Sequence, residues 1–142
     1  MEGYWRTEES LDLLRKYADI GRNCHIASAA RLDGWRGNQS MVIVGNNVTI
    51  TEGCMILCHD AAGSRFGLMD KVGFTRIGDN TFVGIRTVIL AGLQVGKGCI
   101  IGACSVVTKD IPDNEVWAGN PAKFICTVEE YKKKREQHEL QS

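Results

Sequence analysis

A repeat of six residues constrains the fold of this chain more than any other feature of its sequence. From Ile77 onward the chain divides into six consecutive hexapeptides, IGDNTF, VGIRTV, ILAGLQ, VGKGCI, IGACSV and VTKDIP. Each begins with Ile or Val, Gly often follows, and the fifth residue is mostly small. A helix repeats every ~3.6 residues and a plain strand every ~2, so neither explains this spacing. The pattern predicts a short strand and a sharp corner, with the first residue turned into a stacked core.

The same register extends toward the N-terminus. Earlier repeats begin at five aliphatic residues: Ile20, Ile26, Val44, Ile50 and Ile56. Two hexapeptides, LDGWRG and NQSMVI, fit the pattern poorly. The register is also lost in HDAAGSRFGLMDKVGFTR, which follows the last of these repeats and has mixed polarity. We interpret this segment as a loop that projects from one corner of a solenoid, where functional residues are often found.

Two helices are predicted to flank the repeats. Thr7 can cap a helix over residues 8–18, and Thr127 with Glu130 has the spacing of a capping box. We interpret the basic run over residues 132–135 as a solvated helix face. The chain is thus predicted to be one domain, residues 1–142, with an N-terminal helical segment (1–19), β-helix coils (20–59 and 77–118), a loop (60–76) and a C-terminal helix (127–140).

Charge and composition exclude several classes of protein. Lys and Arg number 17, as do Asp and Glu, and this balance argues against a nucleic-acid-binding protein. No apolar run approaches the roughly 20 residues of a membrane-spanning helix. The N-terminal MEGYWRTEES is polar and acidic, unlike a signal peptide, which favours a cytoplasmic protein. The six Cys are then expected to be reduced, with Cys24, Cys54 and Cys99 buried at the fifth position of their repeats.

The run of repeats, together with VVTKDIPDNEVWAGNPAK, resembles the hexapeptide-repeat acyltransferases over about residues 20–126. Within that family the chain is most similar to sugar O-acetyltransferases, such as maltose and galactoside acetyltransferase, and to their relatives in polysaccharide biosynthesis. The resemblance implies an all-β solenoid, the left-handed parallel β-helix. It also implies a homotrimer that binds acetyl-coenzyme A between neighbouring subunits. No metal is expected.

His59 is the predicted catalytic residue. It closes the repeat ILCHD at the start of the loop, where a base could reach an acceptor substrate. Histidine ordinarily titrates near neutral pH, which suits removal of a proton from a hydroxyl that attacks a thioester. The catalytic histidine of the family matches this position. His25 and His138 are expected to have no such role.

Neighbours of His59 suggest further interpretations. Asp60 could orient the imidazole, although adjacent side chains of an extended segment point apart, so Asp70 or a residue of another subunit could do so instead. Cys58 could act as a nucleophile. Its side chain should point away from His59, however, and a core thiol is the favoured interpretation.

The resemblance also assigns the coenzyme A site. A backbone N–H of Gly84 or Ile85 is the expected oxyanion donor. Cys104 departs from the family, because Gly usually stands there. The remaining cofactor-binding residues implied by the resemblance are Ile85, Ala103, Ser105, Thr108, Lys109, Asn120, Pro121 and Lys123.

The acceptor site is less well defined. Its candidate residues lie in the loop and in the irregular repeats: Asp60, Arg65, Phe66, Met69, Asp70, Trp35 and Asn38. Only about 19 residues precede the repeats, which argues against a maltose-type acceptor and favours one from a polysaccharide pathway. The leading hypothesis is therefore transfer of an acetyl group to a sugar hydroxyl.

Three alternatives remain open. One is N-acetylation of an amino sugar, which could be nucleotide-linked. Another is a γ-type carbonic anhydrase, which would need three His ligands for zinc, and His59 has no His nearby in the sequence. The last is a trimeric scaffold without catalytic activity. Release of a thiol from acetyl-coenzyme A would separate the transferase from the scaffold.

Overall fold

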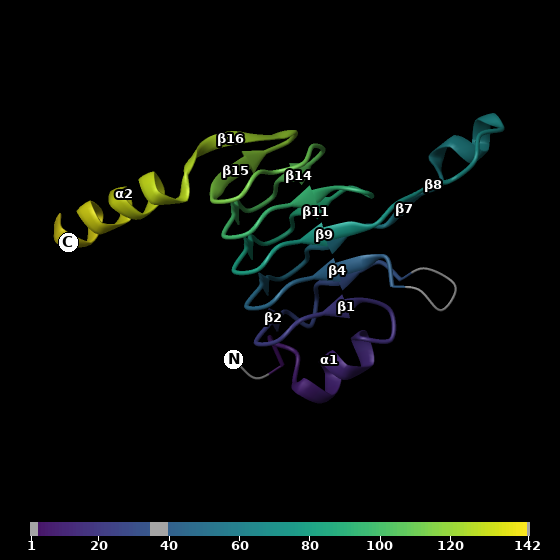
Figure 1. Cartoon of the computed structure of the whole chain (residues 1–142), viewed down its shortest axis with the longest axis horizontal. Helices are drawn as coiled ribbons and strands as arrows, with labels where there is room; N and C mark the ends of the chain where they lie inside the picture. The colour runs from purple at the N-terminus through teal and green to yellow at the C-terminus, as the bar shows by residue number, and fades with distance from the viewer. Residues whose placement is uncertain (1–2, 35–39, 142) are drawn as a thin grey trace.

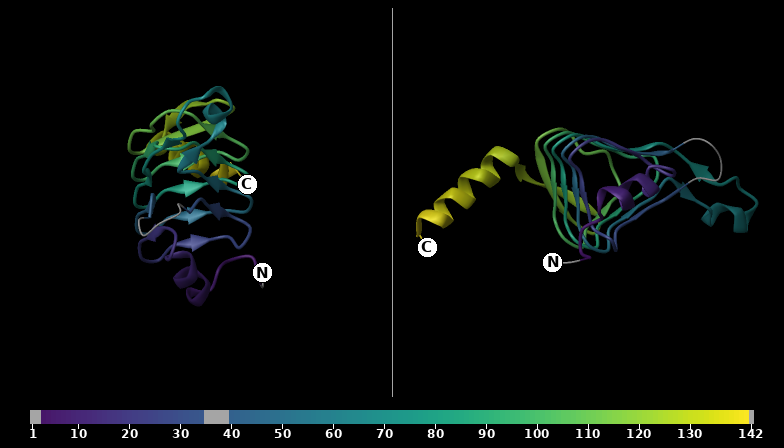
Figure 2. Two further views of the ribbon diagram at one scale, coloured as in Figure 1. Left: turned by 90° about the vertical axis from the view of Figure 1, so that its right-hand side faces the viewer. Right: turned by 90° about the horizontal axis from the view of Figure 1, so that it is seen from below.

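The computed structural model describes residues 3–34 and 40–141. The repeats wind into a left-handed parallel β-helix, a prism whose triangular cross-section is visible end-on in Figure 2. Strands at equivalent positions of successive coils pair in parallel and form three faces. Four coils are complete within the described residues. The fold class predicted from the hexapeptides is confirmed.

Each face is a ladder of short strands. The first face contains β1 (Asp19–Ile20), β4 (Val42–Val44), β9 (Thr75–Ile77) and β12 (Gln94–Val95). The second contains β2 (His25–Ile26), β5 (Thr49–Ile50), β10 (Phe82–Val83), β13 (Ile100–Ile101), β15 (Glu115–Gly119) and β16 (Ala122–Thr127), of which the last is antiparallel to β15. The third contains β3 (Arg31–Leu32), β6 (Met55–Ile56), β11 (Val88–Ile89) and β14 (Val106–Val107).

Two edges of the prism carry many of the predicted site residues. At the arm corner the third face passes to the first face of the next coil, through residues 33–34, 57–58, 90–93 and 108–110. At the amide corner the second face passes to the third, through residues 27–30, 51–54, 84–87 and 102–105. Both edges run along the whole prism, so residues far apart in the sequence are stacked along each of them.

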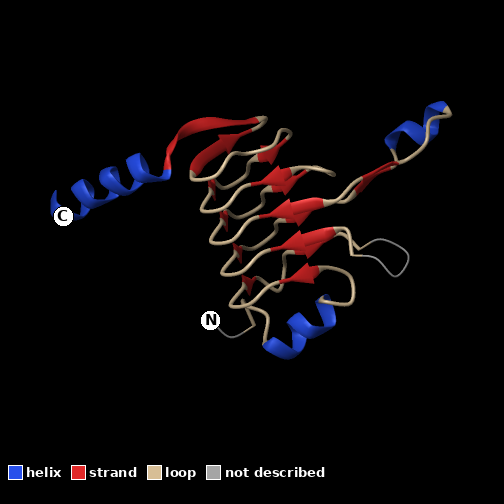
Figure 3. Ribbon diagram, in the orientation of Figure 1, coloured by secondary structure: helices blue, strands red, loops and turns tan. Residues whose placement is uncertain are grey.

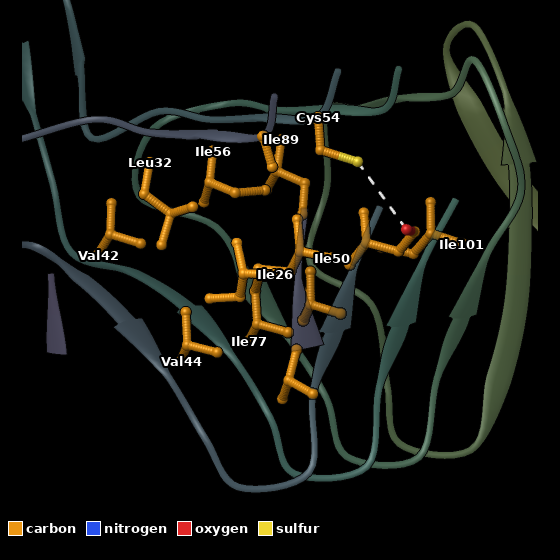
Figure 4. Packing of buried hydrophobic residues seen from close by; sticks show 14 of the residues in the cluster. Ile26, Leu32, Val42, Val44, Ile50, Cys54, Ile56, Ile77, Ile89 and Ile101 are labelled. Carbon is orange, nitrogen blue, oxygen red and sulfur yellow. Dashed lines mark hydrogen bonds between the residues drawn. The ribbon is translucent and has the colours of Figure 1, made fainter. Parts of the chain in front are cut away.

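The first residues of the repeats fill the middle of the prism. Figure 4 shows Ile50, Ile56 and Ile77 pointing into this core, and their exposed fractions are 2% or less. Burial of these apolar side chains is the main force that favours folding. Cys24, Cys54 and Cys99 are also buried. All six thiols are free, including Cys58, Cys104 and Cys126.

A short helix closes the first coil. α1 (Glu8–Leu14) lies across the N-terminal end of the prism, and its Leu11 joins the core (Figure 2). The hydroxyl of Thr7 accepts a hydrogen bond from the Ser10 amide, as a helix N-cap does. The helix is shorter than predicted, because the chain turns after Leu14 to bury Ala18.

A second helix leaves the prism. α2 (Val128–Gln141) extends away from the coils and has no buried residue among those described (Figures 1 and 3). The predicted capping box is present, since Thr127 Oγ1 accepts from the Glu130 amide and Glu130 Oε1 accepts from the Thr127 amide. Over the described ranges, no helix is long and apolar enough to cross a bilayer.

The predicted projecting loop is an arm on the opposite side from α2 (Figure 1). Its base is an antiparallel pair, β7 (His59–Asp60) with β8 (Lys71–Val72), and η1 (Ala62–Phe66) lies farther out. The arm is shorter than predicted. Thr75 and Arg76 already belong to β9, because the Thr75 amide bonds to the Met41 carbonyl of the coil below.

The poorly fitting hexapeptides also have a structural explanation. Leu32 occupies the inward position of β3, and the next inward positions are Val42 and Val44 of β4. The residues between β3 and β4 follow the arm corner of the first coil, and the arm leaves the same corner one coil later. Two acceptor candidates, Trp35 and Asn38, lie outside the described residues.

Candidate active site

A carboxylate and an imidazole meet at the arm corner. His59 Nδ1 lies 2.6 Å from Asp33 Oδ2. The same Asp33 oxygen accepts a hydrogen bond of 3.1 Å from the Cys58 amide. The side chains are partly accessible, at 39% for His59 and 18% for Asp33. This is the geometry of a base held in place by a partly buried acid.

The coil register creates this pair. Leu32 and Ile56 are partners across β3 and β6, so Asp33 lies directly under the residues that lead into the arm. The Asp33 amide donates to the Ile56 carbonyl, which fixes its position. Asp33 is not among the residues predicted from the sequence. The available signal was Leu32, whose aliphatic side chain continues the hexapeptide register and places residue 33 at a corner.

The hydrogen bonds determine which nitrogen of His59 is basic. Burial alone would raise the pKa of Asp33, but the hydrogen bonds from the Cys58 amide and from His59, with the charge of His59, lower that pKa below its usual value. Asp33 is therefore an ionised carboxylate, which only accepts hydrogen bonds. In the neutral imidazole this hydrogen bond places the proton on Nδ1, so Nε2 is the nitrogen that can act as a base.

Cys58 is a core thiol, as predicted. It is fully buried, and its Sγ lies 3.6 Å from Asp33 Oδ2. Burial, then the charge of Asp33 and the hydrogen bond to it, raise the pKa of Cys58 to about 11. The thiol is therefore protonated at neutral pH and is a poor nucleophile.

The atoms of Asp33, Cys58 and His59 that could ligate a metal ion lie within 4.8 Å of one another. Their mutual hydrogen bonds account for this cluster. A three-histidine zinc site is not formed by the described residues, because His25 lies on β2 and His138 lies on α2.

A cavity opens beside the pair. It has a volume of about 210 Å³, and its described lining is Arg31, Asp33, Met55, Leu57 and His59. The lining combines an apolar floor, Met55 and Leu57, with the paired Asp33 and His59 and with the cation Arg31. Sites that bind small molecules typically combine an apolar surface with a small number of polar groups.

The other residues predicted around His59 lie elsewhere. Asp60 Oδ1 accepts a hydrogen bond of 2.8 Å from the Ala62 amide, so Asp60 stabilises the turn into η1. The expectation that Asp60 or Asp70 orients the imidazole is wrong, because Asp33 has that role. Arg65 and Asp70 are exposed on the arm, away from the cavity lining. Phe66 and Met69 are also exposed there, at 84% and 93%.

The structure brings together several residues predicted to bind coenzyme A. Thr108, Lys109, Pro121 and Lys123 line one cavity of about 260 Å³ at the C-terminal end of the prism. Trp117, Ala122 and Phe124 complete its lining. Asn120 lies in the exposed turn between β15 and β16, outside that lining. The sequence analysis missed the two aromatic residues, although both flank the GNPAK motif.

The remaining predicted cofactor residues lie at the amide corner. Ser105 is fully buried. Its hydroxyl donates to the Gly102 carbonyl and accepts from the Gly119 amide, so, contrary to the prediction, this side chain does not contact a ligand directly. The Gly84 amide is already bonded to the Ile101 carbonyl. Ile85 and Ala103 are exposed, and neither amide has an acceptor among the described residues.

His59 at the arm corner and Ile85 at the amide corner are far apart within one chain. Ile85 is separated from the arm corner by the width of the third face. Five residues of extended chain span about 16 Å. A single thioester therefore cannot contact both His59 and the Ile85 amide of the same chain.

A third cavity carries none of the predicted residues. It has a volume of about 540 Å³ and lies over the first face, beside Arg76, Gln94 and Lys97. Gly45, Gly78 and Gly96 also line it, so the hollow arises where side chains are lacking. We assign no role to it.

Comparisons with known proteins agree with the fold. A family of bacterial hexapeptide transferases with six repeats matches residues 74–109. Protein CapG of Staphylococcus aureus is 37% identical over 130 residues, which cover 88% of this chain and 75% of CapG. The chain spans 49% and 30% of the length of two further curated relatives.

Solved structures give the same result. A galactoside acetyltransferase in complex with coenzyme A matches with a TM-score of 0.62 and 30% identity, over 80% of this chain and 56% of that one. A maltose O-acetyltransferase from Clostridium difficile 630 matches with a TM-score of 0.62 and 27% identity, over 86% of this chain and 76% of that one. This chain belongs to the family of hexapeptide-repeat acyltransferases.

Proposed function

We propose that this protein transfers an acetyl group from acetyl-coenzyme A to a hydroxyl of a sugar, with His59 as general base. The observation that carries the proposal is the bond of 2.6 Å between His59 Nδ1 and Asp33 Oδ2, beside an open cavity. Similar solved proteins include a galactoside acetyltransferase and a maltose O-acetyltransferase. Both names describe acetyl transfer to sugars, which supports a sugar acceptor here.

His59 moves the proton. Its Nε2 takes the proton of the acceptor hydroxyl as that oxygen attacks the acetyl carbon. Asp33 stays ionised, holds the imidazole in place and stabilises the imidazolium that forms. His59 then gives the proton to the departing sulfur, so coenzyme A leaves as a thiol. The protonated state of Cys58 supports direct transfer, without an acyl-enzyme.

The C-terminal cavity suits the nucleotide end of the donor. Lys109 and Lys123 carry positive charges that can bind phosphate, and no ion pair with a described acidic residue neutralises them. Trp117 and Phe124 offer surfaces for the adenine ring. Thr108 lies at the arm corner two coils above Leu57, a distance of about 10 Å. The C-terminal cavity and His59 therefore lie along the same edge of the prism.

The separation of the two corners favours a site shared between subunits. We propose a homotrimer in which His59 of one chain faces the amide corner of its neighbour. The amides of Ile85 and Ala103 there would donate hydrogen bonds to the developing oxyanion. We also propose a cytoplasmic location, because six free thiols suit a reducing compartment.

The proposal is tested by following acetyl-coenzyme A and coenzyme A chromatographically with a panel of sugars and amino sugars. This readout avoids thiol reagents, which would also react with the protein. The wild-type protein should release coenzyme A only when an accepting sugar is present. His59→Ala should lower kcat by about 10²–10⁴-fold and leave donor binding, measured by calorimetry, unchanged.

His25→Ala is the matched control. His25 lies outside the site, on β2, with its ring 5.9 Å from that of Trp5. Its variant should keep wild-type activity. Transfer to amino groups alone would overturn O-acetylation. No transfer to any acceptor, with equally weak donor binding by the wild type and His59→Ala, would overturn the enzyme itself and favour a scaffold.

A further inference from the structure

We propose that the acceptor is an anionic sugar whose carboxylate or phosphate is bound by Arg31. This inference rests on the proposed function, and it assigns the substrate class of the same site. It starts from the composition of the cavity beside His59. Arg31 is the one cation among the residues described in that lining, together with Asp33, Met55, Leu57 and His59.

The charge of Arg31 is available to a ligand. Arg31 is exposed, and no ion pair joins it to an acidic side chain in the described part of the chain. Asp33 lies nearby, but its Oδ2 is already engaged by His59 and by the Cys58 amide. Among the described residues, the cavity therefore presents an arginine that has no ion-pair partner, next to a carboxylate that already accepts two hydrogen bonds.

The position of Arg31 fits the acceptor better than the donor. Arg31 belongs to β3 in the first coil, whereas His59 follows β6 in the second. The lysines proposed for the donor, Lys109 and Lys123, lie at the C-terminal end, on the other side of His59 along the prism. A donor arriving from that end leaves the Arg31 side of the imidazole to the acceptor.

The size and shape of the cavity agree with one sugar ring. Its volume of about 210 Å³ is below the range of roughly 300–1,000 Å³ found for drug-sized ligands. Met55 and Leu57 provide an apolar floor for the C–H face of a ring. Arg31 and Asp33 lie two residues apart on the same side of an extended segment, about 6.6 Å. One ring can therefore place a hydroxyl at His59 and an anionic substituent at Arg31.

Guanidinium recognises both carboxylate and phosphate through paired N–H donors. The proposal therefore covers hexuronic acids and hexose phosphates. A neutral hexose would leave the guanidinium without a ligand, and it would lose the contribution of a charge-assisted hydrogen bond.

The experiment compares acceptors that share one ring and differ at C6, where the hydroxymethyl group is replaced by a carboxylate or carries a phosphate. Glucose and galactose are each paired with their uronic acid and with their 6-phosphate, and release of coenzyme A is followed chromatographically. The proteins are the wild type, Arg31→Gln, Arg31→Lys and the control Arg22→Gln. Arg22 is an exposed arginine of the same coil, at a different corner.

The wild type should use at least one anionic acceptor with a KM at least about tenfold below that of its neutral partner. Arg31→Gln should raise this KM at least about tenfold and leave the KM for the neutral sugar and for acetyl-coenzyme A unchanged. Arg31→Lys should restore part of the effect, and Arg22→Gln should have none. Comparison of the KM values for the uronic acids and for the hexose phosphates identifies which anion Arg31 binds.

Equal KM values for charged and neutral acceptors would overturn this inference and leave sugar acetylation intact. An equal rise of KM for both acceptors in Arg31→Gln would also overturn it, because Arg31 would then act by shaping the cavity. Absence of transfer to all acceptors, charged or neutral, would contradict the proposed function instead.

Discussion

At the scale of single residues, Asp33 connects folding with catalysis. Its carboxylate is one-fifth exposed or less and accepts hydrogen bonds from His59 and from the Cys58 amide. These bonds stabilise the folded state only while Asp33 is ionised. In the proposed mechanism the same negative charge stabilises the imidazolium that forms during transfer. Removal of the charge should therefore affect stability and activity with different pH dependences.

The first prediction concerns Asp33→Asn. Because hydrogen bonds lower the pKa of Asp33, its carboxylate stabilises the protein above the unfolded pKa, and this contribution is lost as the pH falls through the folded pKa. At pH 7 the variant should lose about 1–3 kcal/mol of unfolding free energy and about 10²-fold or more in kcat. Below about pH 4 the stability difference should shrink. Denaturant titrations of the wild type and the variant at both pH values measure this. The same difference in unfolding free energy at both pH values would contradict the prediction.

The second prediction concerns Cys58. A thiol with a pKa of about 11 is not a nucleophile at neutral pH, so Cys58→Ala should keep kcat within a few-fold of the wild type. Its stability should fall, because a buried sulfur is lost. Cys24→Ala, at a buried thiol between β1 and β2 and outside the site, provides the control for loss of a core sulfur. Loss of turnover, with an acetylated Cys58 detected by mass spectrometry in the wild type, would contradict direct transfer.

The sequence predicted half of the catalytic pair. His59 was recognisable because it ends a regular repeat at the start of a long loop. Asp33 was not, because a segment inserted after Leu32 interrupts the hexapeptides, and the pairing depends on a contact between coils 26 residues apart. Similarly, the sequence predicts the amide of Gly84 or Ile85 as oxyanion donor. Only the structure shows that the Gly84 amide already donates to the Ile101 carbonyl and is therefore not available.

At the scale of elements, the corners limit which residues the coils can accept. Successive coils approach closely there. A Cβ added at Gly78 would lie 2.6 Å from the carbonyl carbon of Gly96 and 2.7 Å from the Lys97 amide nitrogen. Both atoms belong to the backbone of the next coil and cannot move without shifting that coil. The glycine that follows many aliphatic positions is therefore explained by stacking.

The third prediction follows from this contact. Gly78→Ala should destabilise the protein by about 1–3 kcal/mol, the usual range for overpacking, and lower its Tm. Gly63→Ala is the control, because its nearest neighbour is the Cβ of Leu68, an exposed side chain of the arm. Thermal unfolding followed by circular dichroism measures both. Equal Tm values for the two variants would show that the corners tolerate an added methyl group.

The repeats predicted the strands well and the flanking segments less accurately. An aliphatic residue every six positions determines which side chains face inward, so the faces could be read directly. The end of α1 depends on tertiary contacts, since the Arg15 side chain bonds to the carbonyls of Ile20 and Gly21 in the first coil. The antiparallel base of the arm, β7 with β8, has no hexapeptide signal, and it was predicted only as a loop.

At the scale of the whole molecule, the single chain leaves much apolar surface uncovered. The arm carries Phe66, Leu68 and Met69, with exposed fractions between 66% and 93%. Patches of this kind mark interaction sites in soluble proteins. A net charge of zero offers little electrostatic resistance to association. Together with the separated corners, these features favour an assembly in which each chain supplies part of a site.

The fourth prediction tests that assembly by complementation. His59→Ala removes the base, and Ala103→Trp fills the exposed amide corner, so each variant alone should be inactive. If His59 of one chain works with the amide corner of the next, every mixed trimer of the two variants contains one intact site of three. Differently tagged chains, co-expressed and purified as mixed trimers, should then recover roughly one third of the wild-type kcat. Mixed trimers without activity would place the base and the amide donors of each site in the same chain.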